Sequence, residues 1–168
     1  YDELRRLGLR EATEARFRQR FPGQTGMLVV NQVIPGGSAD GKLQVGDVLV
    51  QVQGRDVAEF VPLEAILDDA VGQPVAVSVE RGGTPLELSI GVQDLDAVAP
   101  AEYLEFGDAV VHPLSLQLAR HYNRPASGIY VANPGYVFGT AAIPRAAVIV
   151  SVDDRPVNDL DSLDSLLS

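Results

Sequence analysis

The sequence predicts a mostly β protein with short helices, in the α+β class, built as two tandem small antiparallel β-sandwich or barrel modules. An internal repeat carries this prediction, because residues 46–57 reappear about one hundred positions later as residues 146–157 with the same order of apolar and turn positions. Residues 26–30 likewise match residues 128–132. The second copy stops at Ser168, before any counterpart of the last two strands of the first copy. We therefore expect the second module to be incomplete at its C-terminal end.

A length of 168 residues fits two small domains, and the repeat sets their limits. We expect a first domain over residues 1–93, a linker over residues 94–102 and a truncated second domain over residues 103–168.

The first half of the first domain reads as a helix followed by a strand. Residues 11–21 have glutamates early and arginines late, an order that suits the helix dipole, and Pro22-Gly23 ends the helix. Residues 27–34 form an apolar, β-branched run that is typical of a strand, and residues 35–38 form a proline-glycine turn.

The second half reads as a strand, a helix and a hairpin. Valines alternate with other residues over residues 47–53, which predicts a strand with two faces. Pro62 suits the first turn of a helix over residues 62–71. Two alternating segments with a glycine turn between them predict an antiparallel hairpin over residues 75–90. In the second domain we expect a short helix over 113–122 and strands over 128–132 and 147–152.

Composition excludes several classes of function. The formal net charge of −10 argues against partners with a phosphate backbone and against binding to an anionic membrane surface. The absence of cysteine excludes disulfides, thiolate catalysis and zinc–thiolate sites. No apolar run approaches the ~20 residues that span a bilayer, so we expect no membrane insertion by this chain. One lysine against twelve arginines indicates a GC-rich coding sequence and a bacterial source.

The motifs that resemble catalytic or cofactor-binding sites each lack a required residue or spacing. Residues 36–42 have the glycine and lysine spacing of a phosphate-binding loop, but Leu43 stands where a serine or threonine must hold magnesium. His112 and His121 do not have the spacing of a zinc-binding helix. We expect no catalytic residue, no metal site and no cofactor, so this chain by itself is not expected to be an enzyme.

A family resemblance begins at Leu7-Gly8-Leu9. After these residues come a strand, the turn at residues 35–40, the strand start at residues 43–49, and the helix that contains Leu63. In this order the chain resembles a PDZ domain as arranged in HtrA/DegP-type serine proteases, and it is most similar to the tandem PDZ region of the subgroup of fungal nuclear HtrA-like proteases. The resemblance is strong over residues 5–90 and weaker over residues 103–168.

The resemblance implies a peptide-binding groove in the first domain. In a PDZ domain a loop with a central glycine offers backbone N–H groups to the terminal carboxylate of a peptide, and the peptide adds as a strand beside the next strand. This loop corresponds to Leu7, Gly8 and Leu9, and Arg6 adds positive potential beside it. The helix forms the other wall, with apolar positions at Leu63, Ile66, Leu67 and Ala70. The sequence leaves open whether these positions, Ile66 in particular, face the groove or only the core.

The second domain departs from the pattern at its loop. Phe106-Gly107-Asp108 stands in the place of the first loop with Glu105 before it, and these two carboxylates would repel a peptide carboxylate. Gly46-Asp47 has become Ala146-Ala147. We expect this domain not to bind C-termini; it binds internal segments, packs on its neighbour or self-associates. Its missing hairpin predicts an exposed strand edge.

The resemblance implies a regulatory PDZ fragment that binds C-terminal or unfolded apolar peptide segments and lies downstream of a trypsin-like protease domain. The alternatives are a non-enzymatic PDZ adaptor and a PDZ module of another processing protease. Bacterial relatives with this role work mainly in the cell envelope, which is the compartment expected on that basis.

Overall fold

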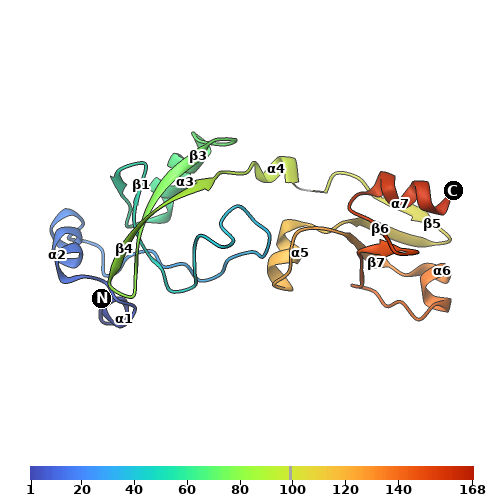
Figure 1. Cartoon of the computed structure of the whole chain (residues 1–168), viewed down its shortest axis with the longest axis horizontal. Helices are drawn as coiled ribbons and strands as arrows, with labels where there is room; N and C mark the ends of the chain where they lie inside the picture. Colours follow the sequence, from blue (N-terminus) through green and yellow to red (C-terminus); the bar gives the residue numbers. More distant parts are fainter. Residues whose placement is uncertain (99) are drawn as a thin grey trace. The chain divides into compact units, whose positions relative to one another are not determined.

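The computed structural model describes residues 1–98 and 100–168 and divides the chain into two compact units, Tyr1–Asp94 and Leu95–Ser168 (Figure 1). Each unit contains an open four-stranded antiparallel sheet with short helices around it, and the second also has a two-stranded ribbon. The predicted mostly β, α+β class is confirmed, and the described sheets are open rather than closed barrels. No helix in the described residues is both long enough and apolar enough to cross a membrane.

The first unit is built around one long hairpin and one central strand. Its sheet has the order β2-β1-β3-β4. Its elements are α1 (Asp2–Arg6), α2 (Glu11–Arg20), β1 (Val48–Val52), β2 (Arg55–Asp56), α3 (Phe60–Asp68), β3 (Pro74–Arg81) and β4 (Thr84–Gly91). The expected strand over residues 27–34 is reduced to residues 28–30, which meet β1 at a single bridge between Val29 and Val48.

The two faces of β1 carry different helices, because successive side chains of a strand point to opposite faces. On one face Val48 packs with Leu4 and Leu9, and Val50 packs with Phe17 of α2. On the other face Leu49 belongs to the main core cluster, which α3 covers.

Buried charge joins α2 to the hairpin. Glu80 of β3 is 1% exposed and accepts hydrogen bonds from the backbone N–H of Arg10 at 2.7 Å, from Arg10 Nε at 2.8 Å and from Thr13 Oγ1 at 2.5 Å. Burial alone would raise the pKa of Glu80, but these donors hold it below its ordinary value. Asp47 forms a similar link at the start of β1, since its two carboxylate oxygens accept from Arg81 Nε and Nη2 at 2.7 Å each.

The second unit has a sheet of order β5-β6-β7-β8 and a ribbon of β9 and β10. Its elements are α4 (Leu95–Val98), β5 (Leu104–Phe106), β6 (Ala109–Pro113), α5 (Leu116–His121), β7 (Ile129–Asn133), α6 (Gly135–Thr140), β8 (Val148–Ile149), β9 (Ser151–Val152), β10 (Arg155–Pro156) and α7 (Leu160–Leu167). Its core consists of Val111, Ile129, Val131, Val157 and Leu163.

The described second unit has no counterpart of β3 and β4, as the repeat predicted. The difference shows in one pair of repeated valines: Val50 is 6% exposed, whereas Val150 is 54% exposed. Within the described residues, the edge that β3 covers in the first unit is therefore open along β8 and β9.

Candidate functional site

Leu7-Gly8-Leu9 forms the end of helix α1. The N–H groups of these residues donate to the carbonyls of Glu3, Arg5 and Leu4 at 3.1, 3.0 and 2.9 Å. This is the Schellman arrangement, in which a residue with positive φ closes a helix. Gly8 has a φ of +99°, and Leu9 packs back on Leu4. All three N–H groups of the predicted carboxylate loop therefore have partners within the chain.

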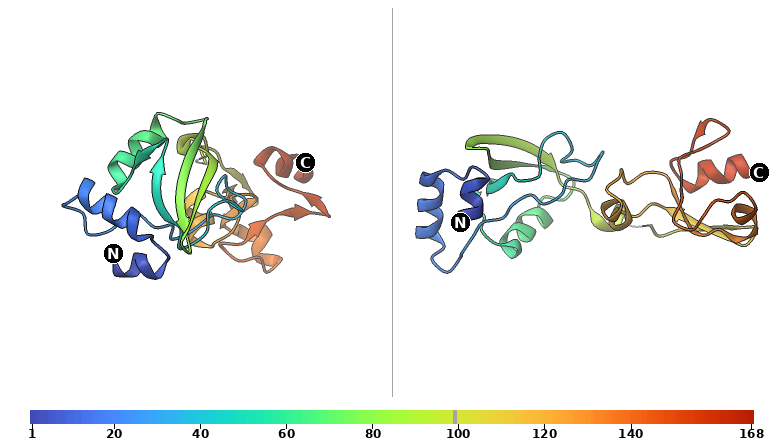
Figure 2. Two further views of the ribbon diagram at one scale, coloured as in Figure 1. Left: turned by 60° about the vertical axis from the view of Figure 1, so that its left-hand side comes forward. Right: turned by 90° about the horizontal axis from the view of Figure 1, so that it is seen from below.

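Gly8 has a second reason to lack a side chain. A Cβ built there would lie 2.3 Å from the backbone nitrogen of Gly83 and 2.6 Å from Gly82. Figures 1 and 2 show the tip of the β3–β4 hairpin reaching α1 in this way. The close approach of two backbones at Gly8 thus brings the N-terminal helix and the hairpin together.

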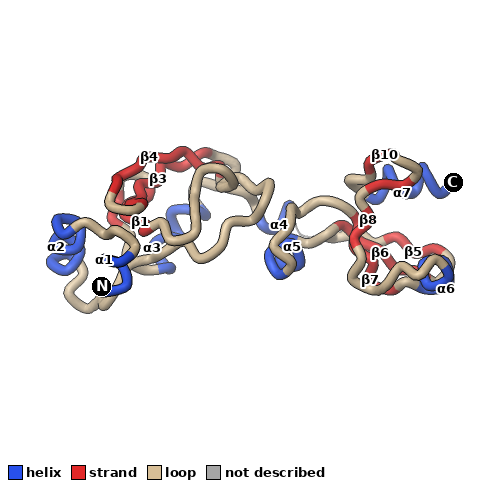
Figure 3. Tube along the Cα trace, turned by 60° about the horizontal axis from the view of Figure 1, so that its bottom comes forward, coloured by secondary structure: helices blue, strands red, loops and turns tan. Residues whose placement is uncertain are grey.

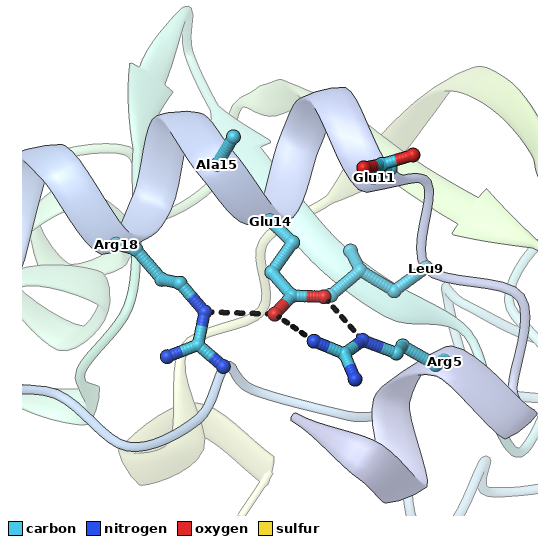
Figure 4. A pocket seen from close by; sticks show the side chains of 6 residues that line it. All are labelled: Arg5, Leu9, Glu11, Glu14, Ala15 and Arg18. Atoms are coloured by element: carbon cyan, nitrogen blue, oxygen red, sulfur yellow. Dashed lines mark hydrogen bonds and ion pairs between the residues drawn. The ribbon is translucent and has the colours of Figure 1, made fainter.

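The charges next to this loop are mostly paired. Arg6 lies on the surface, and its Nη1 donates to Glu3 Oε1 at 2.8 Å. Figure 4 shows Arg5 of α1 and Arg18 of α2 converging on Glu14, with three hydrogen bonds of 2.7 Å, across a cavity of about 530 Å³. The hydrogen bond from Arg5, followed by that from Arg18, lowers the pKa of Glu14 to about 2. This cluster holds α1 to α2.

The predicted wall of the groove lies on α3 and just beyond its end. All four side chains are half-buried and pack against the main core cluster, together with Leu28 of the short strand: Leu63, Ile66, Leu67 and Ala70. The structure thus gives Ile66 the same core-facing position as its neighbours. Leu9 packs on the opposite face of β1, beside Val48, so the loop and the helix wall do not share one hydrophobic cluster.

The first unit has an unpaired backbone edge that was not predicted from the sequence. Towards β1, the N–H of Val30 donates to Asp47 and the carbonyl of Val30 accepts from Gly46, at 2.9 and 2.8 Å. Within the described residues, the backbone groups of Val29 and Asn31, which point the other way, form no hydrogen bond. We call the outward backbone of residues 28–31 the open edge. Val29 is 37% exposed there.

The second unit shows what such an edge can hold. Val131 of β7 makes the same two bonds that Val30 makes, donating to Ala147 and accepting from Ala146 at 2.9 Å each. Val30 and Val131 are therefore equivalent in structure, whereas the sequence repeat aligned Val29 with Val131. The other edge of β7 pairs with β6, with Val111 opposite Val131 and His112 opposite Tyr130. Among the residues that the structure describes, no strand takes the place of β6 beside the open edge of the first unit.

The two predicted loops are not equivalent in structure. Helix α5 ends as α1 does: the N–H of Asn123 donates to Arg120, that of Arg124 donates to Ala119, and Asn123 has a φ of +49°. Residues 106–108 instead form the turn between β5 and β6.

The comparisons with known proteins match one family to each of the two units. Residues 15–92 match the family described as "PDZ domain", and residues 97–168 match the family described as "PDZ-like domain". The chain is a tandem pair of PDZ domains. It is 48% identical to Protease Do-like 7 of Arabidopsis thaliana over 100% of its length, and 45% identical to the Pro-apoptotic serine protease NMA111 of Ajellomyces capsulatus over 96%. The NMA111 protein of Scheffersomyces stipitis is 37% identical over 97%.

These relatives confirm the resemblance to HtrA-like proteases. The PDZ pair spans 15% to 17% of the length of the three relatives. They come from a plant and from fungi, so the bacterial source expected from composition finds no support. No cluster of three or more potential metal ligands occurs in the described residues.

Proposed function

We propose that this PDZ pair is the regulatory part of an HtrA-like serine protease, and that its first domain binds C-terminal or unfolded apolar peptide segments. The relatives named above support the protease context. The observation that supports the peptide function is the open edge, where the N–H and carbonyl groups of Val29 and Asn31 point away from the sheet and have no hydrogen-bond partner among the described residues. An extended peptide satisfies such groups by adding as a strand.

The surroundings of the open edge suit an apolar peptide. Leu28, at its start, shares a hydrophobic cluster with the four half-buried positions of the helix wall, Leu63, Ile66, Leu67 and Ala70. In the second domain the added strand β6 contributes Val111 to the corresponding cluster, and this side chain is fully buried there. A peptide with apolar residues at alternate positions would be buried in the same way.

Arg6 is the group we propose for the peptide carboxylate. The N–H groups of Leu7, Gly8 and Leu9 are used at the helix end, so the exposed guanidinium of Arg6 is the more accessible donor. Leu7 lies near the inner side of the same strand, because a methyl group added at Gly46 would lie 3.5 Å from Leu7 Cδ2, and Gly46 donates to the carbonyl of Val30 on the side of β1. The chain itself is proposed to have no proteolytic activity and to act on a protease domain elsewhere in the polypeptide.

Amide NMR titration of the whole chain tests this proposal. A six-residue apolar peptide with a free C-terminus should bind with roughly micromolar affinity, about −8 kcal/mol. Saturable shifts should appear at Val29, Asn31 and residues 63–70. The C-terminal amide of the peptide should bind more weakly, and Arg6→Gln should remove that difference, whereas Arg55→Gln on the surface of β2 should not.

Two outcomes would count against the proposal. Equal affinity for the acid and the amide peptide would remove the carboxylate role of Arg6. Saturable binding without shifts along residues 28–31 would place the peptide elsewhere.

A further inference from the structure

The second domain contains a strand on the outer edge of β6. In the first domain the corresponding position of β6 is itself vacant, whereas here β6 is present and pairs on both sides: with β7 on one edge and with β5 on the other. The β5–β6 register is antiparallel, with Leu104 opposite Val111 and Phe106 opposite Ala109. An extended peptide adds to a free strand edge of a sheet. In the second domain the outer edge of β6 is used by the chain itself.

The apolar side chains of β5 pack into the core of the second domain. Leu104 and Phe106 point to the same face, since they are two residues apart. Both pack against the core cluster that contains Leu163 of α7, while Glu105 between them is exposed. The ring of Phe106 meets that of Phe138 edge to face, with centroids 5.3 Å apart. The strand therefore presents two apolar side chains to the core of the domain, as a bound peptide would.

A tight turn holds β5 in this place. Gly107 and Asp108 have φ values of +51° and +59°, the left-handed pair that a two-residue type I′ hairpin requires. The carbonyl of Gly107 accepts from the N–H of Tyr136 at 3.2 Å, and that of Asp108 accepts from Asn133 Nδ2 at 3.3 Å. Figure 3 shows β5 on the margin of the sheet, with α6 at the end where this turn lies.

We propose that β5 is a built-in occupant of the outer edge of β6, and that its release opens a site for an extended segment with apolar residues at alternate positions. Two features of β5 make release feasible. It is only three residues long, and it is held to the sheet on one side only. The occupant that replaces it must match Leu104 and Phe106, because these two side chains fill the apolar space.

Two substitutions at Asp108 distinguish a domain in which β5 covers the edge of β6 from one in which β5 is released. Asp108→Pro forces a negative φ and breaks the type I′ turn, whereas Asp108→Gly favours the turn, and both remove the same carboxylate. The probe is a synthetic peptide with the sequence of residues 101–106, acetylated and with a free C-terminus. By amide NMR on the whole chain, the proline variant should bind it with saturable shifts at residues 109–111 and at Leu163. The glycine variant and the unmodified chain should bind at least ~10-fold more weakly, because their site is occupied.

Equal binding by all three proteins, or no binding by a folded Asp108→Pro variant, overturns the proposal. If that variant loses the amide signals of β7, hydrogen exchange in the unmodified chain decides instead. Release of β5 requires the amides of Leu104 and Phe106 to exchange at least ~10-fold faster than that of Val131. Equal exchange rates would show that β5 leaves only when the whole domain unfolds. Neither readout involves the first domain, so this test is independent of the proposed function.

Discussion

Replacing Gly8 by alanine tests whether this glycine is a structural contact. The left-handed φ of +99° costs an alanine about 1–2 kcal/mol. The new Cβ would also lie 2.3 Å from the backbone of Gly83, so the hairpin tip must move, which costs about 1–3 kcal/mol as an overpacked contact does. The structure thus predicts a loss of about 2–5 kcal/mol in the free energy of unfolding of the first domain.

Gly72→Ala is the matched control. Gly72 also has a positive φ, +77°, but no atom lies within 4 Å of the place that an alanine methyl group would take, so only the conformational cost applies. Thermal unfolding followed through the amide signals of β3 should place the midpoint of Gly8→Ala about 5–20 °C below that of Gly72→Ala. Equal midpoints would show that the contact between Gly8 and Gly83 does not limit stability, and would favour a role of Gly8 in ligand binding.

Paired and repeated residues give three more tests. Arg81→Met should lower the free energy of unfolding of the first domain, measured in urea, by about 3 kcal/mol, because it leaves the buried carboxylate of Asp47 without its ion pair. Adding Asp47→Ala should recover most of this loss, and no recovery would contradict the pairing. The pKa of Glu14 is lowered from 4.5 to about 2, so the stability that Glu14 contributes is present above pH 4.5 and is lost as the pH falls toward 2. The urea midpoint of the Glu14→Gln variant should therefore change less over that pH range than the urea midpoint of the unmodified chain. Val50→Ala should lower the free energy of unfolding by about 2 kcal/mol and Val150→Ala by about 0.5 kcal/mol or less, because the two valines are 6% and 54% exposed. Similar losses would show that the edge along β8 and β9 is covered in solution.

Alternation in the sequence was sufficient to predict β1 and the β3–β4 hairpin. Pro62 and the apolar spacing after it predicted a helix over residues 62–71, and the structure has α3 at Phe60–Asp68. Helix α1 was missed, because residues 2–6 carry no apolar periodicity and the helix depends on its closure by Gly8 and on the contact between Leu4 and Leu9. Strand β5 was missed for a related reason: three residues are too few to show a period, and only pairing with β6 defines it.

The candidate site was predictable only in part. A glycine between two leucines fits a carboxylate-binding loop and a helix end equally well, since both need a positive φ. The apolar spacing of α3 likewise fits a core and a groove wall, and it is the clusters of the folded domain that place Leu63 and Ile66 toward the core. The open edge has no sequence signal at all, because it consists of backbone groups whose partner strand is absent.

The ion pair between Asp47 and Arg81 also bears on a difference between the two copies. Arg81 belongs to the hairpin that the described second domain lacks, and at the position of Asp47 that domain has Ala147. A buried aspartate is costly without its arginine, so Asp47 and Arg81 stabilise the fold only as a pair. Anyone who grafts a β3–β4 hairpin onto β8 would therefore need to change Ala147 as well, because the incoming arginine would otherwise meet a methyl group.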